Sequence, residues 1–137
     1  MITIDEMLKG KKMEDLSPEI QKNLPILLGK INKVRAAWGK PLTVTSCVRT
    51  HDEQIEVYRK KGIFDITKIP MNSKHIHGAA IDFYDPDLSF TQWLKDNPNI
   101  MADKDLYAEL GNKNWVHLQF LPFGSYKSGG TRWFSPS

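Results

Sequence analysis

The chain has 137 residues, a hydrophobic content of 40% and a formal net charge of +3, so we treat residues 1–137 as one domain with a single core. No apolar run approaches the roughly 18 residues of a membrane span, and the basic residues are too dispersed to indicate a nucleic-acid partner. The first residues include the acidic pair Asp5 and Glu6 and no long apolar stretch, so we expect no secretory signal.

A long helix is expected after residue 17. Ser17 is a suitable N-cap and Pro18 suits the first helical position. Pro25 either interrupts this helix or opens a second one. Apolar residues at near-helical spacing predict a stripe that faces the core: Leu24, Leu27, Leu28, Ile31, Val34 and Trp38.

A strand is expected at 42–48, because Gly39 and Pro41 end the helix and a short apolar stretch follows. Cys47, the only cysteine of the chain, lies in this strand and is expected to be a small buried side chain. A single cysteine excludes an intramolecular disulfide and a cysteine-rich zinc site.

Two capping-box patterns predict two shorter helices. Thr50 to Glu53 opens a helix through about Lys61, and Ser89 to Gln92 opens another that ends before Pro98. The stretch 63–72 between them reads as a loop that borders a substrate cleft. With the strands, these helices predict an α+β fold, a small and mainly antiparallel sheet with flanking helices.

Two segments carry residues suited to metal chemistry. His75 precedes a predicted strand at 79–83 that contains Asp82, and His117 lies in a second predicted strand at 115–120. Because strand side chains alternate between faces, each strand can present its polar residue on one face and an apolar layer on the other. Three nitrogen or oxygen ligands with a fourth position left for water are typical of a catalytic zinc site. The residues therefore predict a metal-dependent hydrolase with a single zinc site on the sheet.

The two segments fit a longer pattern, Ser-x-His-x-x-Gly-x-Ala-x-Asp followed downstream by Trp-x-His. The first motif is matched at Ser73, His75, Gly78, Ala80 and Asp82. In this pattern the chain resembles the zinc D-alanyl-D-alanine carboxypeptidase superfamily. That group includes the vancomycin-resistance dipeptidases and carboxypeptidases and the L-alanyl-D-glutamate endopeptidases of phage endolysins. The resemblance extends from about Leu42 to Gln119.

The resemblance implies that one Zn²⁺ is bound by His75, Asp82 and His117, and that the substrate is a peptidoglycan stem peptide. It also implies a place in the site for Arg49, whose guanidinium could stabilise an oxyanion or hold a substrate carboxylate. The expected activity is that of a zinc metallopeptidase, either a phage-type endopeptidase that lyses the cell wall or a D,D-carboxypeptidase. We expect a monomer, made in the cytoplasm, that acts at the wall after lysis-type release or as a virion component.

The general base departs from the family pattern. Members of the superfamily often carry a carboxylate three residues before the last zinc histidine, and this chain has Asn114 there. An amide cannot accept a proton from water and could only orient it. Glu109 is the nearest upstream carboxylate, with Asp105 and Asp103 behind it, in a helix-like turn that ends at Gly111. Glu109 is therefore either the catalytic base or a solvated helix carboxylate.

Two other classes of protein remain open. Asn114 favours a zinc-binding module that has kept the fold and lost turnover, with a structural or wall-binding role. The aromatic tail, with Trp133 and Phe134, would suit a wall- or partner-binding protein that needs no metal. Metal content separates the last class from the others, and turnover separates the enzyme from the inactive module.

Overall fold

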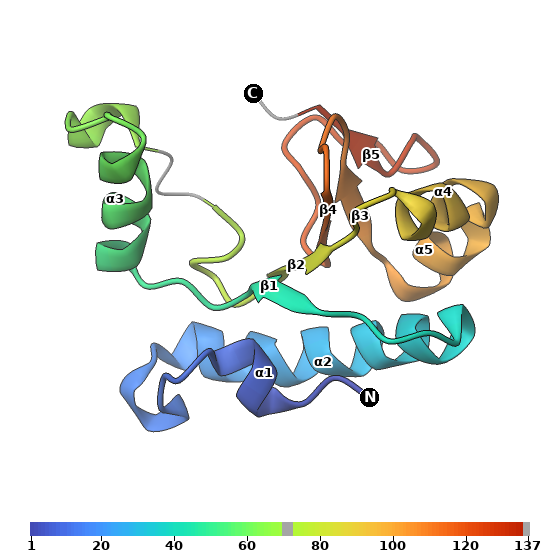
Figure 1. Ribbon diagram of the computed structural model, residues 1–137, viewed down its shortest axis with the longest axis horizontal. Helices are drawn as coiled ribbons and strands as arrows, with labels where there is room; N and C mark the ends of the chain where they lie inside the picture. Colours follow the sequence, from blue (N-terminus) through green and yellow to red (C-terminus); the bar gives the residue numbers. More distant parts are fainter. Residues whose placement is uncertain (70–72, 136–137) are drawn as a thin grey trace.

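A single five-stranded sheet with helices along its face and side organises the computed structural model, which describes residues 1–69 and 73–135 (Figure 1). The helices are α1 (Ile4–Leu8), α2 (Pro18–Trp38), α3 (His51–Lys60), α4 (Ser89–Asp96) and α5 (Pro98–Lys104), with short 3₁₀ turns at Met13–Asp15 and Ile66–Lys68. The strands are β1 (Val44–Ser46), β2 (Ala80–Tyr84), β3 (Tyr107–Glu109), β4 (Trp115–Gln119) and β5 (Trp133–Phe134).

The sheet has the strand order β1-β2-β4-β3-β5. The pairs β1–β2, β2–β4 and β3–β4 are antiparallel, and only β3–β5 is parallel. The expected α+β fold with a mainly antiparallel sheet is therefore confirmed. The neighbouring interior strands β2 and β4 carry Asp82 and His117, which are direct partners in the register.

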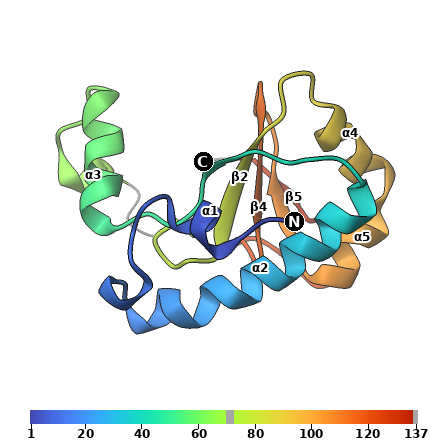
Figure 2. The same ribbon diagram turned by 60° about the horizontal axis from the view of Figure 1, so that its bottom comes forward.

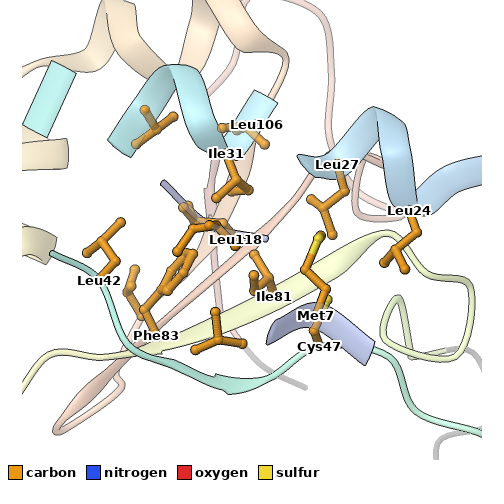
Figure 3. Close-up of a cluster of buried hydrophobic side chains, with 14 of the residues drawn as sticks. Met7, Leu24, Leu27, Ile31, Leu42, Cys47, Ile81, Phe83, Leu106 and Leu118 are labelled. Carbon is orange, nitrogen blue, oxygen red and sulfur yellow. The ribbon is translucent and has the colours of Figure 1, made fainter. Parts of the chain in front are cut away.

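The apolar face of the sheet packs against α2 and α1, which lie along that side of the molecule (Figure 2). Alternation along β2 and β4 buries one set of side chains completely or nearly so: Ile81, Phe83, Val116 and Leu118. Leu27 and Ile31 of α2 point into the same cluster (Figure 3). Each such side chain contributes about 1.5–3 kcal/mol when it is removed from water. This core holds β2 and β4 in register and leaves their opposite face for polar residues.

Several local predictions are confirmed by the structure. Ser17 caps α2 through its Oγ, which accepts from the Ile20 N–H at 3.2 Å. Thr50 and Glu53 form both hydrogen bonds of a capping box at the start of α3. Cys47 is buried, and its pKa is raised to about 12, mainly by burial and also by the charge of Asp82. A thiol with that pKa stays protonated, which agrees with a structural role.

Other local predictions need correction. Helix α2 runs through Pro25 without a break, because the fully buried residues on both sides of it, Leu24 and Leu27, anchor the helix to the core. The expected strand at 42–48 is shorter, since only Val44–Ser46 forms a strand, and its pairing with β2 contains a register shift. The chain also forms α5 directly after α4, beginning at Pro98.

Helix α4 is not capped by Ser89 as predicted. Its N-cap residue is Leu88, which makes no side-chain cap hydrogen bond. The buried carboxylate of Asp85 takes over this function, accepting from the backbone N–H of Phe90 at 3.2 Å and of Thr91 at 2.8 Å. A carboxylate that arrives from the preceding loop satisfies the same free N–H groups as a local cap.

The loop that carries His75 is seated directly on α2. Asn23 donates through Nδ2 to the carbonyl of His77 at 2.9 Å. Gly78 adopts a φ of +70°, and a Cβ built there would lie 3.0 Å from the Ile20 Cα. The loop therefore turns where its backbone lies close to the helix backbone, and only glycine satisfies both conditions.

Gly78→Ala should destabilise the protein by about 2–4 kcal/mol, because the left-handed φ and the overlap with Ile20 both add to the cost. Gly62→Ala is the matched control, since Gly62 also has a positive φ (+86°) but nothing within 4 Å of its Cβ position. It should cost only about 1–2 kcal/mol. Denaturant unfolding of both variants measures the difference, and equal losses would contradict the close approach to α2.

Candidate metal centre

Three side chains converge on the polar face of the sheet. Asp82 of β2 and His117 of β4 are cross-strand partners, and the loop before β2 brings in His75. The His117 Nδ1 lies 2.8 Å from Asp82 Oδ1, and the His75 Nε2 lies 3.3 Å from Asp82 Oδ2. One ligand atom from each residue falls within 4.8 Å of the others. The three residues that the sequence analysis selected are thus brought together.

The His75 ring is oriented by the chain itself. Its Nδ1 lies 2.7 Å from the carbonyl oxygen of Cys47. Because a carbonyl only accepts, Nδ1 must carry a proton, and Nε2, which faces Asp82, is the nitrogen left to bind a metal. The backbone of the histidine is fixed as well, since its carbonyl accepts from Arg49 N–H at 3.2 Å and its N–H donates to Ser73 Oγ at 3.3 Å.

The charge of Asp82 is stabilised within the cluster. Burial raises the pKa of this carboxyl, but hydrogen bonds and charges from His117 and His75 outweigh burial and hold the pKa well below its usual range. For His117, burial lowers the pKa, while the hydrogen bond and charge of Asp82 raise it above the usual value overall. A carboxylate that stays ionised between two imidazoles is an anionic centre that a cation can occupy by displacing a proton.

The residues present fit a zinc ion. Two imidazole nitrogens and one carboxylate oxygen are the donor set of an open catalytic zinc site. One ring nitrogen of His75 is already held by a carbonyl, an arrangement typical of metal-bound histidines. His77 does not join the cluster, because its Nδ1 faces Glu19 Oε1 at 2.6 Å, on α2. The three-ligand set therefore leaves a position for solvent or substrate.

The cluster forms the floor of a cleft of about 1130 Å³. One wall comes from α3 and the chain before it, with Arg49, Gln54 and Tyr58, and the other from the C-terminal segment 123–135. Residues 63–69, the described part of the expected border loop, do not line this cleft, although Lys61 and Ser73 on either side of it do. Residues 70–72 lie outside the described part of the chain.

Arg49 lies in the cleft with its guanidinium held on one edge. Nη1 donates to Gln54 Oε1 at 2.8 Å and Nη2 donates to Ser46 Oγ at 3.0 Å. A guanidinium has five N–H donors, so donors remain for a ligand in the cleft. The structure places this predicted residue in the same cleft as the three metal-binding candidates.

Glu109 ends strand β3 and does not lie in a helix-like turn, so that part of the sequence interpretation is wrong. The register between β3 and β4 pairs Tyr107 with Gln119 and Ala108 with Leu118. One further step along the register brings Glu109 opposite His117. Glu109 lines the cleft, and burial raises its pKa, a change that the positive charge of His117 opposes and the charge of Asp82 reinforces.

A hydrogen-bonded chain fixes the Glu109 carboxylate. With its amide nitrogen turned toward the carboxylate, Asn112 donates to Glu109 Oε1 at 2.9 Å and accepts from Trp115 Nε1 at 3.1 Å. No sequence pattern indicates this contact, because Asn112 lies in the turn between β3 and β4, where there is no periodicity. The turn thus connects the acid on one strand to the aromatic residue that begins the next.

Asn114 is not among the residues that line the cleft. It lies in the bend just before β4, and its side chain is exposed. Its backbone carbonyl accepts from Asp85 N–H at 2.9 Å. In this chain the side chain at position 114 therefore lies outside the cleft, whereas Glu109 lines it.

The sequence analysis assigned two groups of cleft residues no place beside the metal-binding candidates. Gln119 shares the strand face of His117, a signal that alternation contained. The C-terminal wall had no such signal, since Trp133 and Phe134 reach the cleft by parallel pairing of β5 with β3. The aromatic tail is therefore part of the cleft, with Phe134 packed edge-on against the ring of His117 at a centroid distance of 6.0 Å.

An antiparallel sheet with two histidines and an aspartate at the floor of a cleft is the arrangement of a metal-dependent hydrolase. A sequence model of the family described as Peptidase M15 matches residues 2–119, and the chain belongs to this family of zinc D-Ala-D-Ala carboxypeptidases and related peptidases. At the family level this means a zinc-dependent metallopeptidase that acts on peptidoglycan. No curated protein and no solved structure matches the chain. None of the helices in the described residues is long and apolar enough to cross a membrane.

In the metal-free protein, the contribution of the Asp82–His117 pair to the free energy of unfolding should depend on pH. Because the pKa of Asp82 is lowered in the folded protein, the stability that Asp82 contributes is present above about pH 4. It is lost as the pH falls toward the folded pKa. Because the pKa of His117 is raised in the folded protein, the stability that His117 contributes is fully present below about pH 6.5. It is lost as the pH rises through the folded pKa.

The difference in unfolding free energy between the wild type and Asp82→Asn, both without metal, should therefore be largest between about pH 4 and 6.5. Urea titrations at several pH values measure it. A difference that stays constant from pH 4 to pH 9 would contradict the coupling between the two residues.

Proposed function

We propose that this protein is a zinc peptidase that hydrolyses an amide bond of peptidoglycan stem peptides, as a cell-wall-lysing endopeptidase or a D,D-carboxypeptidase. His75, Asp82 and His117 hold the zinc ion, Glu109 is the general base, and Arg49 binds the substrate. The observation that carries the proposal is the meeting of a three-ligand cluster and a partly buried carboxylate in one cleft.

Zinc bound at this centre would lower the pKa of a water molecule toward about 7 and polarise the scissile carbonyl. Glu109 supplies the proton transfer. Its carboxylate accepts a proton from the attacking water, whose oxygen bonds to the carbonyl carbon, and passes the proton to the amine nitrogen as the carbon–nitrogen bond breaks. The raised pKa of Glu109 makes it a stronger base than an exposed glutamate, and Asn112 holds one of its oxygens in place.

Arg49 is suited to bind a carboxylate or an oxyanion of the stem peptide. Gln54 and Ser46 fix the guanidinium before any substrate arrives, so less side-chain entropy is lost on binding. Lys61, which follows α3, and Lys74 also line the cleft and add positive charge to it. The free carboxylates of a stem peptide would therefore lie toward α3, and its less polar groups toward the aromatic wall of Phe123, Tyr126 and Phe134.

Digestion of purified peptidoglycan by the zinc-loaded protein, followed by mass spectrometry of the products, tests the activity. Glu109→Gln should reduce kcat by about 10²- to 10⁴-fold, because a positioned proton acceptor is lost, while the zinc content stays at one per chain. Asn114→Ala is the matched control and should retain the wild-type rate. His117→Ala should lose both zinc and activity.

A wild-type protein that binds zinc and releases no fragments would favour the inactive zinc module instead. Full activity of Glu109→Gln would assign the base to another residue.

Arg49→Gln should lower kcat/KM by about 10- to 100-fold, as expected for the loss of a charge-assisted hydrogen bond of about 1.5–3 kcal/mol. Arg59→Gln removes a cation of the same type from the exposed surface of α3, where Arg59 pairs with Glu56 at 3.7 Å, and should leave kcat/KM unchanged. Thermal unfolding of both variants controls for folding. Equal kcat/KM values for the two variants would remove Arg49 from substrate binding.

A further inference from the structure

The side chain of Gln119 lies directly behind His117. Both residues belong to β4, and Gln119 is 3% exposed. Its Oε1 lies 2.8 Å from the His117 Nε2, and its Nε2 donates to the Leu121 carbonyl at 2.7 Å. Both ends of the amide are therefore engaged within the protein.

The Leu121 carbonyl determines which way the amide points. A carbonyl oxygen has no proton to give, so the NH₂ group of Gln119 must face it. The amide oxygen then faces His117, and because this oxygen also only accepts, the Nε2 of the imidazole must carry a proton. Without metal, the ring can also carry a proton on Nδ1 and donate it to Asp82 Oδ1, which lies 2.8 Å away. When a metal displaces that proton, the neutral imidazole keeps its one N–H at Nε2, and the lone pair is on Nδ1.

We propose that Gln119 is a positioning residue that selects the tautomer of His117 in which Nδ1 binds the metal. The Cys47 carbonyl does the opposite for His75, where it holds Nδ1 and leaves Nε2 free. The two histidines thus present different ring nitrogens to one centre. The inference rests on the proposed function, because it requires His117 to be a zinc ligand.

An amide at this position orients the imidazole without adding a charge. The centre already contains Asp82, and Glu109 lies near enough to influence the His117 pKa. A carboxylate in place of Gln119 would bring a further negative charge behind the ring and would also face the Leu121 carbonyl, oxygen against oxygen. A glutamine gives the orientation and satisfies that carbonyl at the same time.

The test compares zinc affinity, measured by competition with a chromogenic chelator, for Gln119→Met and Gln119→Glu. Methionine has a similar length, but its thioether is only a weak acceptor for the Nε2 N–H. The zinc affinity of Gln119→Met should therefore fall about 10- to 100-fold, as for other substitutions of residues that support a metal ligand. Glutamate restores the acceptor, so its affinity should be closer to that of the wild type. Gln92→Met alters an exposed glutamine that bonds Asp96 and should have no effect.

A second measurement needs no substitution. Long-range ¹H–¹⁵N NMR of the zinc-bound wild type should show His117 bound through Nδ1 and protonated at Nε2. Binding through Nε2, or a Gln119→Met affinity equal to that of the wild type, would overturn the inference and leave the zinc site intact. A wild type that binds no zinc would overturn the metal site, and the inference with it.

Discussion

The burial of one carboxylate between two imidazoles is the constraint on which the rest of the structure depends. Asp82 lies in the middle of the sheet, where an isolated charge would cost several kcal/mol, and it remains ionised because His75 and His117 each face one of its oxygens. This compensation needs β2 and β4 in their observed register. A shift of one residue would turn Asp82 or His117 into the apolar core.

Packing on the opposite face of the sheet stabilises the register of β2 and β4. Helix α2 covers Ile81 and Leu118, the apolar neighbours of Asp82 and His117, and it also seats the loop of His75 through Asn23 and the close approach at Gly78. The same helix thus controls two strands and one loop. Local backbone groups then complete the orientation, with the Cys47 carbonyl behind His75 and the Leu121 carbonyl, through Gln119, behind His117.

The metal cluster could be predicted from the sequence because its information is local: alternation fixes the faces of β2 and β4, and the spacing of His75, Gly78 and Asp82 describes a bend before a strand. Glu109 could be named but not placed, since its strand is only three residues long and is defined by pairing with β4 and β5. Asp85 as the cap of α4 and Phe134 beside His117 were missed for the same reason. Both contacts join residues whose proximity depends on the finished sheet, and no periodic pattern encodes it.

Anomalous diffraction at the zinc absorption edge, from crystals grown with zinc, tests the central claim most directly, which is that the centre is an open, three-ligand site. The account predicts one zinc peak per chain, within bonding distance of His75 Nε2, Asp82 and His117 Nδ1, with solvent in the remaining position and Glu109 facing that solvent. A zinc ion with a fourth protein ligand, or one located away from these residues, would contradict it.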